Sequence, residues 1–218
     1  MTVMEVLEPD GEPTDKKPWR VAAIILAAGC SRRMGRDNKL LLEIDGNTLV
    51  RSSVQNAITS DVQSTIVVLG HEAEKVAAAL EGLEYQPEIN EEYSQGMASS
   101  LRVGVKAAEG FDAVAILLAD MPQVQSKTLD ALLSVFLQQE SPRIIVATHG
   151  GRRGHPVIWP AVCFPDLMTL SGDIGGKQLL KKNAHQVIEA DVESDSIFMD
   201  IDTRSDLAVA NAKPAKRP

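Results

Sequence analysis

Short apolar runs alternate along this chain with longer amphipathic segments, and this alternation constrains its fold most strongly. The runs cover residues 21–26, 65–69, 113–118 and 143–147. They are apolar throughout and rich in β-branched residues, as expected of strands buried on both faces. The segments between them predict helices at 49–59, 72–80, 99–108 and 126–139, with Ser126 as the N-cap of the last. The pattern predicts an α/β domain with a mostly parallel sheet and helices on both faces.

The composition and length narrow the class of protein further. A chain of 218 residues suits one domain. We expect an ordered domain over residues 19–211, a proline-containing acidic tail at 1–18 and a short tail at 212–218. The net charge of -8 argues against binding of long nucleic acid. No apolar window approaches the ~18 residues of a membrane span.

The two cysteines indicate the redox state of the compartment in which the protein is found. Cys30 and Cys163 stand far apart, which fits neither a disulfide framework nor a zinc site. We therefore expect a reducing, cytoplasmic environment.

The loop after the first apolar run has the character of an anion-binding loop. In parallel sheets, ligands bind beyond the carboxyl ends of the strands. The segment 27–39 contains Gly29 and Gly35, whose backbone a ligand can approach, and Arg33 and Lys39, which add positive charge. It fits neither the P-loop nor the dinucleotide fingerprint. The alternative is a glycine turn with solvated cations.

Two acidic segments are candidate metal ligands. Asp120 follows the third apolar run and precedes a rigid proline, a position suited to binding Mg²⁺. Asp200 and Asp202 are two residues apart and face the same side of an extended stretch. The alternatives are a turn aspartate at 120 and, at 202, a member of a capping turn in which Thr203 or Ser205 caps a helix at 206–212.

Three further polar loops stand near helix or strand ends. The segment 95–101 precedes a helix, so its N–H groups and hydroxyls either contact a base or phosphate or only cap the helix. The segment 150–156 is too rich in glycine and arginine to suggest a plain hairpin, and 172–177 combines backbone freedom with charge.

Taken in chain order, these segments resemble the molybdenum cofactor nucleotidyltransferases, most closely the cytidylyltransferase branch. The resemblance runs from about Val21 to Ala210. The matching residues are Leu26 to Gly29, Arg33 to Gly35, Lys39 to Leu41, Gly96-Met97, Ser100-Leu101, Asp120 to Pro122, Arg153 to Val157, Gly172-Asp173, Gly175, Asp200 to Thr203 and Asp206-Leu207.

The resemblance implies a single Rossmann-like nucleotidyltransferase domain that transfers CMP from CTP to the terminal phosphate of molybdopterin. Pyrophosphate would be released, and the cytosine dinucleotide cofactor would serve a client molybdenum hydroxylase. Ala28 stands where the guanylyl branch has a second glycine, which favours CTP by the family pattern. Gly176-Lys177 departs from the family's usual Ala-Arg, so a bidentate guanidinium contact is not expected there.

The resemblance also assigns roles to individual residues. The implied catalytic residues are Arg33, Lys39 and Asp120. The implied ligands of Mg²⁺, or of Mn²⁺, are Asp120 and Asp202, with Asp200 as the alternative to Asp202. The implied nucleotide-binding residues are Leu26, Ala27, Ala28, Gly29, Arg33, Lys39, Gly96, Ser100 and Asp120. On the molybdopterin side the implied residues are His155 and Asp173.

Two other functions are compatible with the same residues. One is a related enzyme, either a guanylyltransferase or a cytidylyltransferase for another phosphorylated acceptor. The other is a non-catalytic module that binds a nucleotide or pterin and delivers it to a client. The two acidic segments favour an enzyme, because binding alone has less need of two metal-binding carboxylates.

Overall fold

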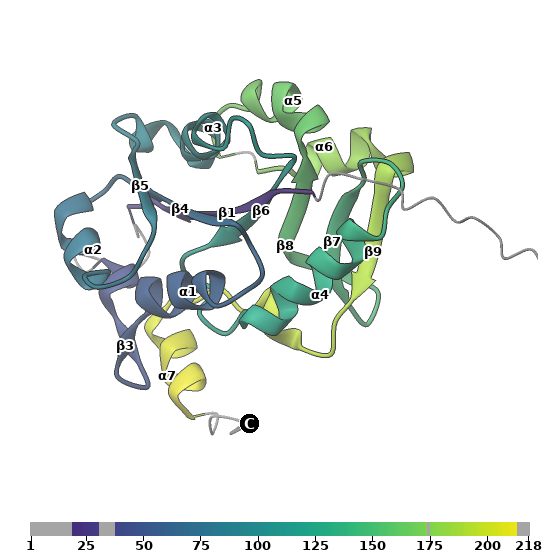
Figure 1. Cartoon of the computed structure of the whole chain (residues 1–218). Helices are drawn as coiled ribbons and strands as arrows, with labels where there is room; N and C mark the ends of the chain where they lie inside the picture. The colour runs from purple at the N-terminus through teal and green to yellow at the C-terminus, as the bar shows by residue number, and fades with distance from the viewer. Residues whose placement is uncertain (1–18, 31–37, 174, 213–218) are drawn as a thin grey trace, which may run out of the picture.

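The computed structural model describes residues 19–30, 38–173 and 175–212. Within these residues a seven-stranded sheet runs through the molecule in the order β5-β4-β1-β6-β8-β7-β9 (Figure 1). Its strands are β1 Val21–Ala27, β4 Ser64–Leu69, β5 Gln86–Ile89, β6 Ala113–Leu118, β7 Ile144–His149, β8 Arg152–Pro160 and β9 Val187–Asp191. A separate two-stranded hairpin consists of β2 Glu43–Ile44 and β3 Asn47–Thr48.

The centre of the sheet is parallel and contains a reversal of strand order. β1 lies between β4 and β6 and pairs with both, so Ile24 is in register with Ile66 and with Ile116. The chain adds β4 and β5 on one side of β1 and then crosses to place β6 on the other side. At such a switch point the loops leave the sheet in opposite directions and open a crevice at the carboxyl ends of the strands.

β8 runs antiparallel to both of its neighbours, β6 and β7, whereas β9 pairs with β7 in parallel. The predicted polar loop at 150–156 is therefore wrong, because these residues form a hairpin. Gly150 and Gly151 have positive φ angles of 56° and 76°, the backbone that a tight hairpin turn requires. Since β8 is reversed, its first residues, His155 included, lie toward the edge where the parallel strands end.

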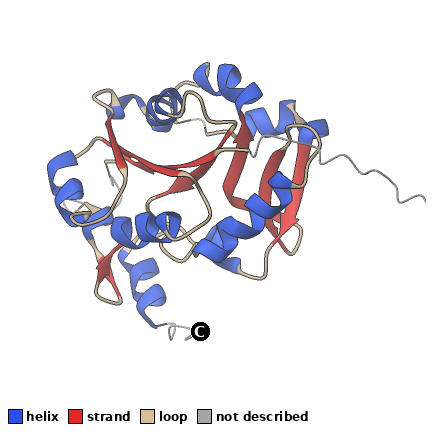
Figure 2. Ribbon diagram, viewed as in Figure 1, coloured by secondary structure: helices blue, strands red, loops and turns tan. Residues whose placement is uncertain are grey.

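Helices cover both faces of the sheet, as predicted (Figure 2). One face is covered by α1 Leu49–Ile58, α2 Ala73–Ala79 and α4 Ser126–Leu137. The other is covered by α3 Met97–Ala107, α5 Phe164–Met168 and α6 Lys177–Lys182. Alternate residues of β1 pack against the two helix layers: Ile25 packs on the side of α1, α2 and α4, and Ile24 packs on the side of α3, α5 and α6.

Short helices and one terminal helix complete the described chain. The 3₁₀ helices are η2 Lys39–Leu41, η3 Tyr93–Gln95, η4 Ala161–Cys163, η5 Ala184–Gln186 and η6 Asp195–Phe198. The last helix is α7 Arg204–Ala212, which packs against β2 and the start of α1 through Ile44, Leu49, Ile201, Leu207 and Ala210. Within the described residues every helix is too short or too polar to cross a bilayer.

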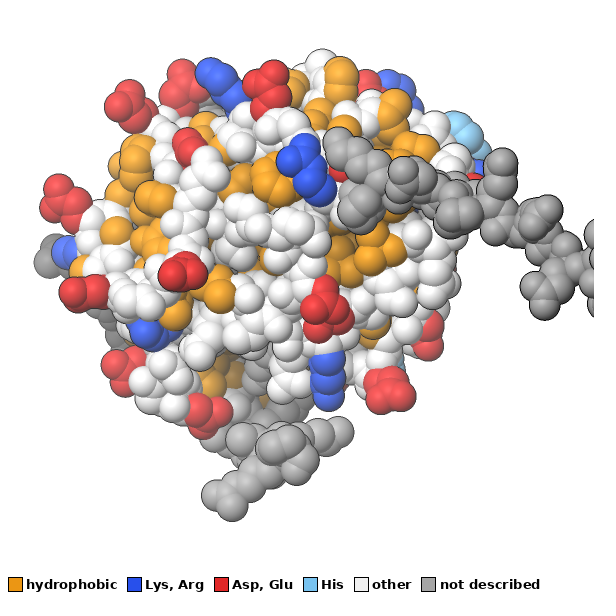
Figure 3. Space-filling model, in the orientation of Figure 1, with side chains coloured by type: hydrophobic (Ala, Val, Ile, Leu, Met, Phe, Trp, Pro, Cys, Tyr) orange, Lys and Arg blue, Asp and Glu red, His pale blue; other side chains and the backbone are white. Residues whose placement is uncertain are grey.

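Some predicted boundaries and elements differ from the observed ones. Ser126 is the first residue of α4 rather than its cap, which is Gln125 without a side-chain hydrogen bond. The predicted helix at 99–108 begins two residues earlier, at Met97. The strands β5 and β9 were not predicted, because they are edge strands without a continuous apolar run: β5 is exposed at three of its four residues, and β9 contains the exposed residues Glu189 and Asp191. On the face in Figure 3, acidic and basic side chains are interspersed rather than gathered into one basic surface.

Candidate active site

A cleft of about 470 Å³ opens where β1 and β6 end. It lies at the switch point of the sheet, as expected for a ligand site in this architecture. Ten of the predicted site residues line it: Leu26, Ala28, Gly29, Lys39, Gly96, Ser100, Asp120, Asp173, Asp200 and Asp202.

Lys39 joins the two acidic segments. Its Nζ lies 2.6 Å from Asp120 Oδ2 and 2.6 Å from Asp202 Oδ1. These partners stand 81 and 163 positions away along the chain, so only the fold brings them together. The three side chains are 14%, 18% and 29% exposed, which shields their charges from solvent.

The ammonium of Lys39 stays charged in this setting. Burial lowers its pKa, but the charge of Asp120 and the hydrogen bonds to Asp120 and Asp202 raise it more, so the net pKa lies above the ordinary 10.5. At neutral pH the cluster therefore places a cation between two carboxylate groups.

Backbone hydrogen bonds fix both carboxylates in place. Ile201 N donates to Asp120 O at 3.0 Å, which ties the loop after β6 to the segment before α7. Asp206 Oδ2 accepts from Asp202 N and Thr203 N at 3.1 and 2.7 Å, and Asp206 N donates to Thr203 Oγ1 at 3.2 Å. This reciprocal pair is a capping box, so the prediction of Thr203 as a cap is confirmed. Asp202 thus belongs to the capping turn by its backbone and to the cleft by its side chain.

The residues of the cluster fit a divalent cation. Among the described residues, the buried Oδ1 atom of Asp120 has no hydrogen-bond partner. Carboxylate oxygens are the ligands that Mg²⁺ and Mn²⁺ accept, and the ammonium of Lys39 marks a place where positive charge is held. No group of three or more His, Cys, Asp or Glu side chains is arranged for a metal in the described ranges. Protein ligands to an ion here would be few, which suits Mg²⁺ because it keeps water and substrate phosphate as its other ligands.

The amino end of α3 forms another wall of the cleft. Gly96 has a φ of 103°, and a Cβ there would lie 2.5 Å from the carbonyl carbon of Gly172. Ala98 N donates to Gly172 O at 3.0 Å. The loop after α5 therefore packs directly on α3 and brings Asp173 beside the predicted nucleotide-binding residues.

Some predicted site residues lie elsewhere. Ala27 is 1% exposed and packs in the core on the α1 side of the sheet, so its side chain does not face the cleft. Arg33 lies outside the described residues. His155 does not line the cleft either. It borders a small separate pocket with Ser53 and Met121, and burial lowers its pKa although the charge of Asp120 opposes this.

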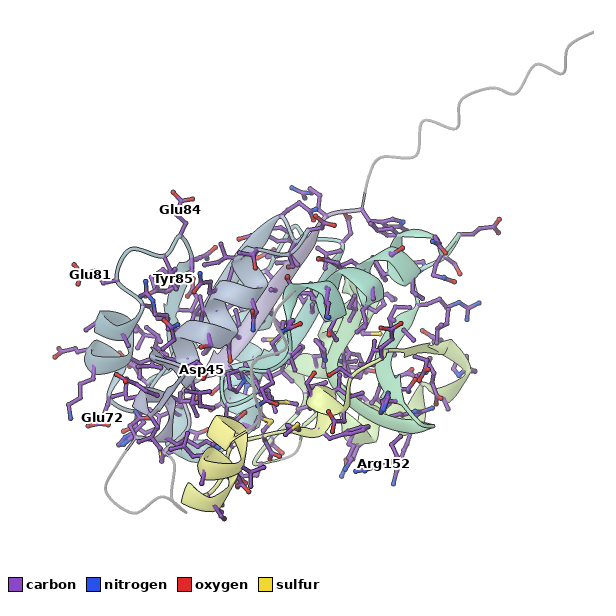
Figure 4. The ribbon with its side chains drawn as sticks, turned by 90° about the horizontal axis from the view of Figure 1, so that it is seen from below. Asp45, Glu72, Glu81, Glu84, Tyr85 and Arg152 are labelled. Carbon is purple, nitrogen blue, oxygen red and sulfur yellow. The ribbon has the colours of Figure 1, made fainter. Side chains whose placement is uncertain are left out.

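The outer side of the β7–β8 hairpin carries cations away from the cleft. Arg152 projects from the molecule in Figure 4, and its guanidinium lies 4.4 Å from the ring centroid of Phe198. Arg153 pairs with Glu189 at 2.8 Å. The arginines of this predicted loop are thus held by neighbouring side chains.

Sequence reasoning missed several residues of the cleft and its support. Tyr93 and Ser94 line it from η3, just before the predicted loop at 95–101. Asn90 lies behind this wall and is 2% exposed. Its signal was a polar residue following a strand, but β5 lacks the apolar run by which the other central strands were found.

Comparison with known proteins identifies relatives over most of the chain. The family described as "MobA-like NTP transferase domain" matches residues 23–187. The chain is 34% identical over 200 residues to the purine catabolism protein PucB of Bacillus subtilis (strain 168), covering 86% of this chain and 94% of that protein. It is 30% identical over 194 residues to nicotine blue oxidoreductase of Paenarthrobacter nicotinovorans, covering 84% and 92%.

A solved structure supports the same assignment. Rv0371c from Mycobacterium tuberculosis H37Rv superposes with a TM-score of 0.79 at 27% identity, covering 90% of this chain and all of that one. Rv0371c has also been crystallised as a complex with manganese. The Rossmann-like fold predicted from the sequence is confirmed by this likeness and by the observed sheet.

Proposed function

Because this chain belongs to the MobA-like NTP transferase family, we propose that it transfers CMP from CTP to the terminal phosphate of molybdopterin and releases pyrophosphate. The observation that carries the proposal is the convergence of Lys39, Asp120 and Asp202 in one cleft at the switch point of the sheet. This grouping suits phosphoryl chemistry, in which a protein chiefly positions its substrates and stabilises charge.

In the proposed reaction an oxygen of the acceptor phosphate attacks the α-phosphorus of CTP in line. A new P–O bond joins the acceptor to CMP, the bond from the α-phosphorus to the bridging oxygen breaks, and pyrophosphate leaves with the electron pair. Lys39, with Arg33, stabilises negative charge on the triphosphate and on the leaving group. Asp120 and Asp202 would hold Mg²⁺, or Mn²⁺, which when bound supplies further positive charge against the phosphates.

The nucleoside is proposed to lie between the β1 loop and α3. Ala28 and Gly29 leave the backbone open on one side, and Gly96 and Ser100 line the other. The choice of CTP rests on Ala28, which the resemblance associates with the cytidylyl branch. Asp173, on the wall formed by the loop after α5, is proposed to contact the acceptor, and His155 is proposed to support that side from beneath.

The test is pyrophosphate release from each of CTP, GTP, ATP and UTP in the presence of molybdopterin and Mg²⁺. We expect release with CTP and at most slow release with the others. Faster release with GTP would make the protein a guanylyltransferase. Release with CTP only when a different phosphorylated acceptor replaces molybdopterin would contradict the acceptor. CTP binding without release would favour a delivery module for a client molybdenum hydroxylase.

A further inference from the structure

Asn90 is a buried polar residue behind the wall of the cleft, and the proposed reaction does not use it. It follows β5, and its backbone N–H donates to Leu69 O at 2.8 Å, which anchors it to the end of β4. Its side chain is enclosed between this strand end and the first turn of α3. A side chain so enclosed is costly to bury unless its hydrogen-bonding groups are satisfied, so its partners are informative.

The orientation of the Asn90 amide is settled by one of these partners. The backbone N–H of Glu92 donates to the side chain at 3.0 Å, and a backbone N–H can only donate. The atom that receives it is therefore the oxygen, Oδ1. The amide nitrogen must then face the other way, where it lies 2.8 Å from Ser99 Oγ and 2.9 Å from Ser100 Oγ. Each of its two hydrogens serves one hydroxyl oxygen.

The two serines differ in what they do with their own hydrogens. Ser99 Oγ donates inward, to the carbonyls of Gly96 at 2.8 Å or Glu92 at 3.1 Å. Ser100 Oγ accepts from Asn90, and no acceptor for its hydrogen is found among the described residues. Ser100 lines the cleft whereas Ser99 does not. The hydroxyl of Ser100 is therefore left to donate toward the cleft.

We propose that Asn90 is a positioning residue that fixes the Ser100 hydroxyl as a hydrogen-bond donor to an acceptor atom of the bound nucleoside, a carbonyl oxygen or ring nitrogen of the base. The inference rests on the proposed function, since it takes a nucleotide as the ligand of the cleft. It goes beyond the proposed function in two ways: Asn90 acts on the ligand without touching it, and the ligand must present a hydrogen-bond acceptor to Ser100.

The substitution Asn90→Asp reverses this polarity with little change of shape. A carboxylate keeps the hydrogen bond from Glu92 N and is favourable near the amino end of α3. It cannot donate, so both serine hydroxyls turn their hydrogens toward it. Ser100 then presents a lone pair to the cleft in place of a hydrogen, and an acceptor on the base meets another acceptor.

The experiment is a double-mutant cycle on the full chain with Ser100→Ala, Asn90→Asp and the combined variant. Dissociation constants for CTP with Mg²⁺ are measured by calorimetry, with CMP and pyrophosphate as partial ligands. We expect Ser100→Ala to raise the dissociation constants of CTP and CMP about three- to tenfold, which corresponds to the loss of one neutral hydrogen bond. Asn90→Asp should raise both by at least as much. The combined variant should lie within about twofold of Ser100→Ala alone, because Asn90→Asp acts on the ligand only through the Ser100 hydroxyl. Pyrophosphate should bind alike throughout.

Ser99→Ala is the matched control, because it removes the other hydroxyl on the same amide. It should lower the melting temperature and leave CTP affinity unchanged. Additive losses in the combined variant, unchanged CTP affinity in Ser100→Ala, or equal weakening of pyrophosphate would each overturn the role of Asn90. If wild type binds another nucleotide more tightly than CTP, the CTP assignment fails and the same cycle is run with that nucleotide. Binding of none of the four would overturn both proposals.

Discussion

At the scale of single residues, the cluster around Lys39 makes the sharpest predictions. One carboxylate oxygen of Asp120 accepts a hydrogen bond from Lys39, and the other is buried and has no hydrogen-bond partner among the described residues. Asp120→Asn keeps the shape and the backbone ties of the loop but removes the charge. We expect kcat for pyrophosphate release to fall ~10²–10³-fold, as for loss of one preorganised charge. Turnover equal to that of wild type would contradict the role of Asp120.

Asp202 and Asp200 form a matched pair for the second carboxylate. Both line the cleft, and Asp202 lies 2.6 Å from Lys39 Nζ. Asp202→Asn should lower kcat strongly and raise the Mg²⁺ concentration needed for half-maximal rate, whereas Asp200→Asn should change either by less than about fivefold. The reverse ranking in a metal titration of the two variants would move the proposed ligand to Asp200.

His155 predicts a dependence of stability on pH. Burial lowers its pKa in the folded protein below the ordinary 6.5. Between the two pKa values the unfolded chain binds more protons, so the free energy of unfolding falls as the pH is lowered through 6.5. His155→Asn, which does not titrate, should show a flatter profile in urea unfolding at pH values on both sides of 6.5. Identical profiles for the two proteins would show that His155 does not contribute.

The sequence could indicate Lys39, Asp120 and Asp202 because each follows or precedes an element whose end is readable from its apolar pattern. It could not place His155 correctly. Its position in a Gly- and Arg-rich segment suggested a loop, but the segment is a reversed strand that carries the imidazole beneath the loop after β6. Asn90 was missed because its role depends on which atoms its side chain bonds. Those partners, Glu92, Ser99 and Ser100, are known only from the folded structure.

At the scale of elements, the packing of α3 on β1 depends on Gly104. A Cβ there would lie 2.4 Å from Ile24 Cγ2. Gly104→Ala gains up to ~1 kcal/mol of helix propensity, but overpacking in a core costs ~1–3 kcal/mol. We therefore expect a net loss of up to ~2 kcal/mol in the free energy of unfolding, measured in urea.

Ile24→Ala provides the control for that prediction, because it removes the atom that the new methyl group would strike. In the Ile24→Ala background, Gly104→Ala should cost less than in wild type, and it should be neutral or stabilising if the clash is the whole effect. An equal cost in both backgrounds would attribute the loss to something other than this contact.

The success of the prediction also differed between elements. Strands β1, β4, β6 and β7 were found because burial on both faces leaves a run of apolar residues. The edge strands carry no such run, and β5 even contains a proline. The direction of β8 is set by the turn at Gly150 and Gly151, a Gly-Gly hairpin signal that the neighbouring arginines obscured.

At the scale of the whole molecule, the cleft joins parts from the entire described chain, so a nucleotide that fills it should stabilise the fold. Ligand at 100 times its dissociation constant adds about 2.7 kcal/mol to the free energy of unfolding. We expect CTP with Mg²⁺ to raise the melting temperature of wild type and to raise that of Asp120→Asn much less. Equal shifts for the two proteins would place nucleotide binding away from the cluster.

The pairing of Lys39 with both carboxylates has a consequence for how folding depends on metal binding. Two aspartates in a shielded place would repel each other, and here the ammonium of Lys39 offsets one of their two negative charges. We therefore expect the chain to fold without a bound metal ion, unlike small domains that fold only around their ion. Chelators should consequently inhibit the protein reversibly without unfolding it. We expect activity to be lost with EDTA and to return on adding Mg²⁺, while the circular dichroism spectrum stays that of the native protein throughout.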